Sequence, residues 1–395
     1  MNKDYLLQLL RNEQEATVSR RRYLHAHPEL SFKEKETAAY ITRFYENLGL
    51  PVQHCRNNYG LTVLIDSGKP GRTLALRADF DALPIQEDTG LPFASVNQGV
   101  MHACGHDAHT AYLMTVAACL ARVKDSFNGK VLIIHQPAEE MAPGGAKGMI
   151  AEGVLDGVDT VMGCHFMSTM PCGKVFYHAG AVQHARSKFT IQVIGKGGHA
   201  SLPEEANDAI LIASELVVNL QSIISRRVAS KESAVLTVGS FDGKGQFNII
   251  KDQVTLEGDV RSMSDYTCQL IEEQVKRICH GLEEAYGCTI KVDYVTDYPV
   301  LVNDKAVTAE VVHILQAEQD LIPEITGIED CGVLNPSEDF AYFAAERPAC
   351  FFYIGAMSEG EVYPHHHPKF RLNEKSLQVA ALAVGSVAWE YLQQK

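Results

Sequence analysis

The feature that most restricts the fold is the pattern of apolar segments, which changes twice along the chain. Up to about residue 181, and again after about residue 297, short apolar runs alternate with segments whose apolar residues recur at helical spacing. These patterns predict strands at 61–65, 73–77, 131–135, 158–164, 175–178 and 350–354, and helical segments at 3–48, 108–123, 144–152, 304–319 and 374–394. Because strands that are apolar throughout are buried on both faces, we expect an α/β domain built on a mostly parallel sheet.

The segment between these two parts has a different order of elements. We expect strands at 188–194, 234–241, 253–261 and 288–295, with helices at 207–228 and 265–286. This βαββαβ order is typical of the ferredoxin-like split unit, a two-layer α+β sandwich. The predicted fold is therefore an α/β domain over residues 1–181 and 297–395, split by an inserted ferredoxin-like α+β domain over 182–296.

Composition excludes several classes of partner. The chain has 35 basic and 49 acidic residues and a formal net charge of −14, whereas binding to nucleic acid requires clustered Lys and Arg. We interpret 111–121 and 379–389 as the most apolar stretches, and both are shorter than the roughly 20 residues of a membrane span. Ten scattered cysteines do not resemble a secreted disulfide scaffold. We therefore expect a cytoplasmic protein with no nucleic-acid or membrane partner.

The segment from His102 to His109 carries three imidazoles, one thiol and one carboxylate just before an apolar helix. This composition is typical of a metal site, although a histidine-rich helix N-terminus is the simpler interpretation. Cys104 and His106 are separated only by a glycine, so a tight turn can direct both side chains toward one ion. We interpret the segment as a source of metal ligands.

Two adjacent carboxylates, Glu139 and Glu140, follow the strand predicted at 131–135. Ligands bind at the carboxyl ends of strands in open α/β sheets. A metal-dependent hydrolase needs one carboxylate to hold the ion and an unligated one to take a proton from water. An isolated pair of this kind is more often two solvated acids, and only the neighbouring motifs favour the metal interpretation.

Further candidate ligands are His165, at the end of the 158–164 strand, and three consecutive histidines between Tyr363 and Phe370. A lone histidine at a strand end more often makes an ordinary hydrogen bond. Together, however, the segments offer more donors than one tetrahedral ion uses, which favours two ions that share a ligand. Asp79 and Asp81 are expected to orient ligating imidazoles, or else to be simple turn residues.

Six motifs, in this order along the chain, resemble those of the M20 metallopeptidase family. They are similar above all to its amidohydrolase branch, which includes hippurate hydrolases, auxin-conjugate hydrolases and N-acetyl-diaminopimelate deacetylases. The motifs are Arg77–Pro84, His102–His109, Gln136–Glu140, Gly197–Ala200, Ser337–Phe340 and His366–Phe370. The resemblance covers essentially the whole chain and implies a two-metal amide hydrolase, with Zn²⁺ or Mn²⁺ as the ions and Co²⁺ or Ni²⁺ as further candidates.

The resemblance also implies roles for single residues. The implied metal ligands are Cys104, His106, Glu140, His165 and His366, the last because it stands two residues before the proline. Glu139 takes the position of the general base and Asp81 that of an aspartate behind the ligands. His199 matches a histidine that reaches a neighbouring active site and stabilises the oxyanion, while Asn248 and Arg261 match contacts to a substrate carboxylate. The inserted domain serves such proteins as a lid and for dimerisation, which implies a homodimer or a higher homo-oligomer.

These inferences lead to one expected function and two alternatives. We expect hydrolysis of an N-acyl amino acid to a carboxylic acid and an amino acid, with Glu139 as general base. A di- or aminopeptidase for short unblocked peptides is the first alternative, although the sequence offers no obvious extra acid for a substrate ammonium. A non-catalytic metal-binding relative is the second, although binding alone does not require both Glu139 and Glu140.

Overall fold

The protein is described by a computed structural model that covers residues 2–393. Its contacts divide the chain into two compact units. The first unit contains the chain up to Gly180, Val302–Val333 and the chain from Asp339 onward; the second contains Ala181–Leu301 and Leu334–Glu338. Residues 1, 394 and 395 lie outside the described residues. The predicted α/β domain includes all three of them, and the helix predicted at 374–394 includes residue 394.

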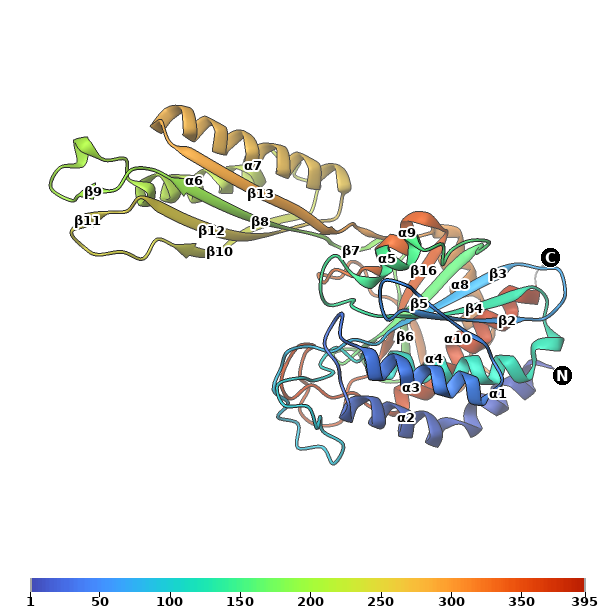
Figure 1. The fold of residues 1–395 in the computed structure, drawn as a ribbon. Helices are drawn as coiled ribbons and strands as arrows, with labels where there is room; N and C mark the ends of the chain where they lie inside the picture. Colours follow the sequence, from blue (N-terminus) through green and yellow to red (C-terminus); the bar gives the residue numbers. More distant parts are fainter. Residues whose placement is uncertain (1, 394–395) are drawn as a thin grey trace. The chain divides into compact units, whose positions relative to one another are not determined.

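An eight-stranded sheet forms the centre of the first unit, in the order β1-β2-β4-β3-β5-β16-β6-β15 (Figure 1). The four central strands, β4, β3, β5 and β16, run parallel to one another, which confirms the mostly parallel sheet. The β1–β2, β2–β4 and β16–β6 pairs are antiparallel. The strands are β1 (Val52–His54), β2 (Leu61–Asp66), β3 (Thr73–Asp79), β4 (Lys130–Gln136), β5 (Thr160–Met167), β6 (Lys174–Tyr177), β15 (Gly327–Asp330) and β16 (Ala349–Gly355).

The helical segment predicted over 3–48 is three helices rather than one. They are α1 (Lys3–Asn12), α2 (Gln14–Ala26) and α3 (Lys35–Asn47). Pro28 explains the second break, because a proline disfavours helical geometry in the residue before it, and His27 has left the helix at φ −124° and ψ 54°. Leu30 then bridges to Ala82, so the break places this loop beside the end of β3.

The remaining helices of the first unit cover the sheet. They are α4 (His106–Arg122), α5 (Gly145–Ala151), α8 (Lys305–Ala317), α9 (Phe340–Glu346) and α10 (Lys375–Gln393), with a short 3-10 turn η1 (Lys124–Ser126). Helix α4 packs on β3 and against α2 and α10, so it is buried almost all round. A helix enclosed in this way is apolar on every face, which explains why its sequence shows little amphipathic pattern. Its N-terminus is thereby held at the carboxyl end of the sheet.

The second unit has the element order β8-α6-β10-β12-α7-β13. Its four-stranded sheet is antiparallel throughout, in the order β10-β12-β8-β13, and α6 and α7 pack on it (Figure 1). Alternate residues of β8, among them Phe189, Ile191 and Val193, are buried under the helices. The elements are β8 (Ala185–Ile194), α6 (Ala209–Arg226), β10 (Ala234–Asp242), β12 (Gln253–Ser262), α7 (Asp265–Tyr286) and β13 (Thr289–Tyr298).

Short elements complete the described chain. Strands β9 (Gly198–His199) and β11 (Ile249–Ile250) pair in the second unit, where η2 (Pro203–Glu205) is a 3-10 turn. Strands β7 (Gly180–Gln183) and β14 (Leu301–Asn303) lie where the chain passes from one unit to the other. None of these short strands was predicted.

Helix α6 is long and apolar enough to cross a membrane by length and composition alone. The expectation of no membrane partner is based on residues 111–121 and 379–389, which do not include α6. One such helix is weak grounds for a membrane span, because core helices of soluble proteins pass the same test. Ile212, Leu216 and Leu220 of α6 are buried in the core of the second unit.

Candidate metal centre

The candidate site lies where α4 begins and where β4 and β5 end. Cys104 and Gly105 precede α4, whose first residue is His106, and Gly105 adopts the left-handed conformation at φ +95°. That conformation suits glycine, and it allows the sharp turn between the two predicted ligands. Ala138 also has a positive φ, of 55°, directly before Glu139 and Glu140. Both turns hold polar side chains at the carboxyl ends of buried strands.

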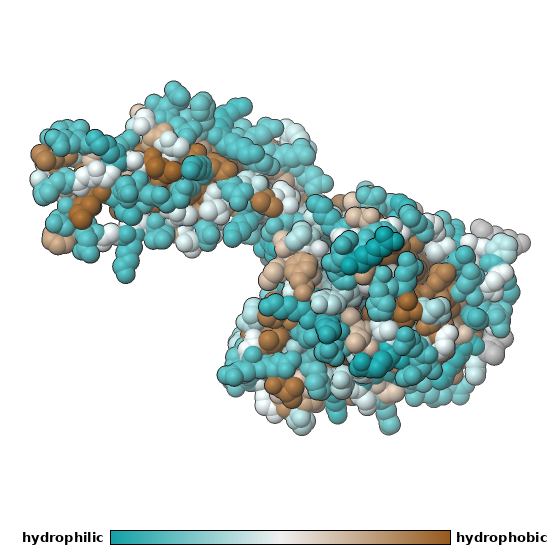
Figure 2. Space-filling view, in the orientation of Figure 1, coloured by the Kyte–Doolittle hydropathy of each residue, from teal (hydrophilic) through white to brown (hydrophobic). Residues whose placement is uncertain are grey.

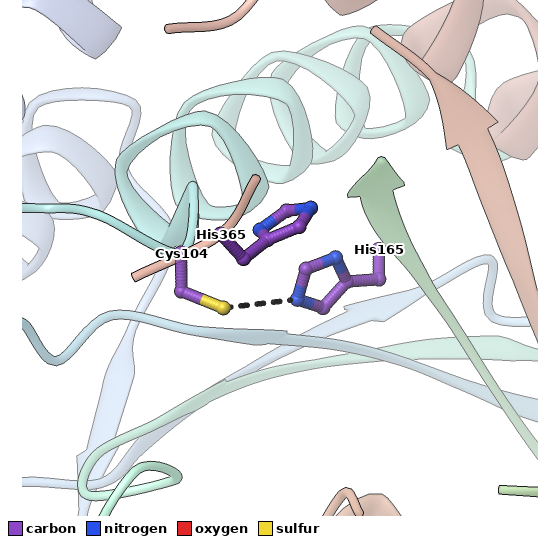
Figure 3. Close-up of side chains that lie close together, drawn as sticks. All are labelled: Cys104, His165 and His365. Atoms are coloured by element: carbon purple, nitrogen blue, oxygen red, sulfur yellow. Dashed lines mark hydrogen bonds between the residues drawn. The ribbon is translucent and has the colours of Figure 1, made fainter. Parts of the chain in front are cut away.

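Two groups of donor atoms meet at Cys104. Ligand atoms of Cys104, His106 and Glu140 lie within 4.8 Å of one another, and so do those of Cys104, His165 and His365. Figure 3 shows the second group, in which Cys104 Sγ is 3.4 Å from His165 Nε2. Four of the five predicted ligands therefore fall in two groups that share one thiol.

The fifth predicted ligand, His366, lies beside the first group. Its Nε2 is 3.1 Å from Glu140 Oε1, and its side chain is 51% exposed. The preceding residue, His365, was not predicted as a ligand. The only sequence signal for it was the run of three histidines, because the resemblance selected one of them by its distance from the proline.

Asp81 orients the first group of donors. One carboxylate oxygen lies 3.1 Å from His106 Nδ1, and the other accepts hydrogen bonds from Ser31 Oγ and from the Glu140 N–H. His106 Nε2 is buried and makes no hydrogen bond with any described residue, and buried Glu140 Oε1 has the ion-pair contact with His366 but no hydrogen bond of normal geometry. Buried imidazole nitrogens and carboxylate oxygens that lack a hydrogen bond are suited to bind a cation.

His109 also lies within ligand distance of His106 and His165, but both of its ring nitrogens are already engaged. Nδ1 lies 2.5 Å from Asp79 Oδ1, and Nε2 accepts the Phe166 N–H at 3.1 Å. Asp79 is in turn bound by the buried Arg77 guanidinium at 2.7 Å. We therefore interpret His109 as a support for the neighbouring strands rather than as a ligand.

The electrostatics of the group are those of a cation site. Burial lowers the pKa of His106, but the carboxylates of Asp79, Asp81 and Glu140 outweigh burial and raise that pKa to about 10. Burial, together with Glu140 and Glu139, raises the pKa of the Cys104 thiol well above its usual range. Burial, followed by His109 and His365, holds the pKa of His165 well below the ordinary value and keeps this ring neutral. Clustered carboxylates around a thiol and a neutral imidazole fit a divalent cation.

Glu139 is buried beside the donor groups without belonging to either group that contains Cys104. Its Oε2 lies 4.0 Å from His106 Nε2, and its Oε1 accepts the Asp339 N–H at 3.4 Å. Asp339 is itself fixed by Arg77 and Gln136. The two adjacent glutamates thus take different positions, one among the donors and one next to them.

The other predicted site residues lie in the second unit. His199 is exposed, and its Nδ1 is 2.7 Å from Ser201 Oγ. Asn248 and His199 line the same surface hollow, and the Asn248 carbonyl accepts the Ala200 N–H. Arg261 pairs with Asp259 at 2.8 Å and donates to Ser337 Oγ at 2.8 Å. Their roles toward a substrate remain predictions.

Residues 75–390 match the model of peptidase family M20/M25/M40. The chain belongs to this peptidase family. The match includes every residue of the two donor groups and Glu139. The M20 protein is accordingly a hydrolase that acts on amide bonds, as its relatives show.

Three relatives are similar to the M20 chain over most of its length. A solved structure from methicillin-resistant Staphylococcus aureus, described provisionally as an aminohydrolase, is 56% identical, covers 99% of this chain and 100% of its own, and has a TM-score of 0.94. An N-acyl-L-amino acid amidohydrolase of Geobacillus stearothermophilus is 38% identical over 77% of this chain and 82% of its own. The solved YXEP protein of Bacillus subtilis, a dinuclear metal-binding peptidase of family M20, is 30% identical over 98% of this chain and 100% of its own, with a TM-score of 0.83.

Proposed function

We propose that this M20 hydrolase cleaves the amide bond of N-acyl amino acids and releases a carboxylic acid and an amino acid. The observation that carries the proposal is the arrangement at Cys104, where two donor groups share one thiol and Glu139 lies beside them. Two ions held by a shared ligand, with an unligated carboxylate next to them, are what two-metal hydrolysis of an amide requires. The likeness to an N-acyl-L-amino acid amidohydrolase supports this choice of substrate.

The residues that would hold the ions are Cys104, His106, Glu140, His165 and His366. Cys104 belongs to both groups and would supply a thiolate, which favours zinc, although manganese suits the carboxylates. When bound, such ions polarise the substrate carbonyl and lower the pKa of water. Cys104 must lose its proton when metal binds, and a divalent charge offsets the carboxylates that raise its pKa.

Glu139 is the proposed general base. Its carboxylate takes a proton from the attacking water as the new C–O bond forms, and then delivers that proton to the leaving amine nitrogen as the amide C–N bond breaks. General acid–base groups of this kind contribute about 10²- to 10⁴-fold in rate. The Asp339 N–H that contacts Glu139 helps to fix the orientation of the carboxylate.

The second unit, which we interpret as the ferredoxin-like lid and dimerisation domain, supplies the proposed substrate contacts. His199 would stabilise the negative charge that develops on the carbonyl oxygen, and Arg261 and Asn248 would bind the carboxylate of the amino acid. Hydrophilic residues cover most of the drawn surface, with separate apolar patches among them (Figure 2). We also propose a homodimer formed through this unit, with the face of α6 that carries exposed Leu211 and Val218, at 51% and 72% exposure, as its interface.

Substitution of Glu139 by glutamine tests the proposal directly. We expect Glu139→Gln to keep its fold and metal content and to lose at least a hundredfold in kcat, because the amide cannot accept the proton of water. Glu140→Gln is the matched control, since loss of a ligand should lower the metal content measured by elemental analysis. Near-normal turnover in Glu139→Gln would refute the role of the base.

A substrate panel separates this proposal from a peptidase function, which the likeness to the YXEP peptidase favours as the second candidate. The purified protein, loaded in turn with zinc, manganese, cobalt or nickel, would be assayed on acetyl-, benzoyl- and indoleacetyl-amino acids and on plain dipeptides. We expect acylated substrates to have the higher kcat/KM. A clear preference for dipeptides with a free α-amino group would establish the peptidase instead.

A further inference from the structure

The second donor group contains a histidine that the family resemblance does not assign. His365 lies with Cys104 and His165, and its ring centroid is 5.1 Å from that of His165 (Figure 3). His366, which the resemblance does assign, lies instead beside Glu140 of the first group. Consecutive histidines of one loop thus lie beside different donor groups.

The backbone of this loop explains how both side chains can turn toward the site. Neighbouring residues of an extended chain point to opposite sides, whereas His366 adopts a left-handed conformation at φ +64°. For a residue that is not glycine this conformation is unfavourable, so the surroundings must enforce it. The His366 N–H donates to the Ala103 carbonyl at 2.9 Å, and the Tyr363 carbonyl accepts the Ser168 hydroxyl at 2.9 Å. The loop is therefore tied to the segments that carry Cys104 and His165.

One ring nitrogen of His365 lies within 4.8 Å of the ligand atoms of Cys104 and His165. The Ser168 N–H donates to His365 Nε2 at 3.3 Å, so Nε2 carries the lone pair and Nδ1 the proton in the neutral ring. Nδ1 is buried and forms no hydrogen bond with any described residue. A hydrogen bond of 3.3 Å is long for a backbone donor, which leaves Nε2 weakly satisfied.

We infer that His365 is a metal ligand, and that Cys104, His165 and His365 form a three-residue site for one of the two ions. This inference rests on the proposed two-metal centre and adds one residue to it. Thiolates and imidazoles are both donors that zinc binds, and three protein ligands are the number that catalytic zinc sites use, with the remaining position left for water or substrate. His366 then serves the other ion, together with Cys104, His106 and Glu140.

Cobalt binding to three matched variants tests the inference. His365→Gln, His366→Gln and His367→Gln each change one imidazole of the same loop, and His367 belongs to neither donor group. His367 Nδ1 accepts the Lys369 N–H, and its ring stacks on Tyr363. Each metal-free protein would be titrated with Co²⁺ against a competing chelator, while the near-ultraviolet thiolate-to-cobalt absorption reports cobalt bound at Cys104, the donor that both sites share.

We expect His365→Gln to weaken binding of one of the two cobalt ions by more than about 10- to 100-fold, the loss that follows removal of a residue behind a ligand, and to shift the visible bands of that ion. His367→Gln should match the natural protein in both measurements. Titrations and spectra of His365→Gln that superimpose on those of His367→Gln would overturn the inference and leave the two-metal centre intact. Failure of the natural protein to bind cobalt at all would overturn both.

Folding of the variants is checked independently of metal. The melting temperature of each metal-free variant would be compared with that of the metal-free natural protein, and His365→Asn provides a second substitution. Weakened cobalt binding in both His365 variants, with unchanged melting of the metal-free forms, supports a ligand. Weakened binding that accompanies a lowered melting temperature in both variants would instead assign His365 a structural role.

Discussion

At the scale of single residues, the site depends on carboxylates that lie behind the proposed ligands. Asp79 is the last residue of β3 and Asp81 lies just beyond it, and each is hydrogen-bonded to a different imidazole, His109 and His106 respectively. The sequence suggested this role because the two acids alternate after a buried strand. It did not reveal which imidazole each would contact, because the partners belong to α4 and only the packing of α4 on β3 decides the pairing.

Loss of Asp81 should weaken metal binding without removing a ligand. We expect Asp81→Ala to lower the metal affinity by about 10- to 100-fold, because His106 and the Glu140 backbone lose the group that orients them. Chelator competition measures the affinity. Asp88→Ala is the control, since the Asp88 side chain is 73% exposed and its carboxylate lies 3.8 Å from Lys369 Nζ. Equal affinities in the two variants would contradict the orienting role.

Glu34 should make the stability of the metal-free protein depend on pH. Burial and the charge of Asp81 raise the pKa of Glu34 to about 8. The folded chain therefore keeps this proton up to about pH 8, whereas the unfolded chain releases it near its ordinary value. Between these two pH values the unfolded state binds fewer protons, so the free energy of unfolding falls as the pH rises.

Substitution of Glu34 by glutamine removes this titration. Relative to the natural protein, Glu34→Gln should gain stability progressively between pH 5 and pH 8, by at most about 4 kcal/mol, and then level off. Urea unfolding at pH 5, 6.5 and 8.5 in the presence of a chelator measures the difference. A difference that stays constant over this range would show that Glu34 titrates normally.

At the scale of elements, strands and helices with strong local patterns were predicted well. Helix α7 begins and ends at Asp265 and Tyr286, as expected, because Ser264 caps its N-terminus and Gly287 is left-handed at its C-terminus. The short strands β1 and β15 were missed. Each has three or four residues and lies at an edge of the sheet, so its conformation depends on the neighbouring strand more than on its own sequence.

Two glycines of the second unit should respond in opposite directions to alanine. A Cβ at Gly258 of β12 would lie 2.0 Å from the Phe189 ring and 2.5 Å from the Thr237 carbonyl oxygen, whereas a Cβ at Gly281 of α7 meets nothing within 4 Å. We expect Gly258→Ala to destabilise the protein by about 1–3 kcal/mol. Gly281→Ala should stabilise it by about 0.5–1 kcal/mol, because alanine is the better helix former. Thermal unfolding of both variants measures the effects, and a Gly258→Ala protein as stable as the natural one would show that Phe189 can move aside.

At the scale of the whole molecule, the chain leaves the first unit at Gly180 and returns to it at Val302. Strand β16 then pairs with β5, although the two are far apart in the sequence. The change of pattern indicated an insertion, since each part has its own local order of elements. The place of β16 between β5 and β6 could not be derived in this way, because local periodicity carries no information on which strands become neighbours.

If His199 acts on the site of a neighbouring copy, two inactive variants should restore activity in a mixed dimer. His199→Ala and Glu139→Gln would be purified separately, mixed in equal amounts and allowed to exchange subunits. A hybrid then has one site with both defects and one site with Glu139 and a partner's histidine intact, so about a quarter of the natural activity should return in a symmetric dimer. Turnover after mixing, with each variant alone as control and light scattering to establish the dimer, measures the effect. If His199 acts within its own copy, every site in the mixture carries one defect and no activity returns.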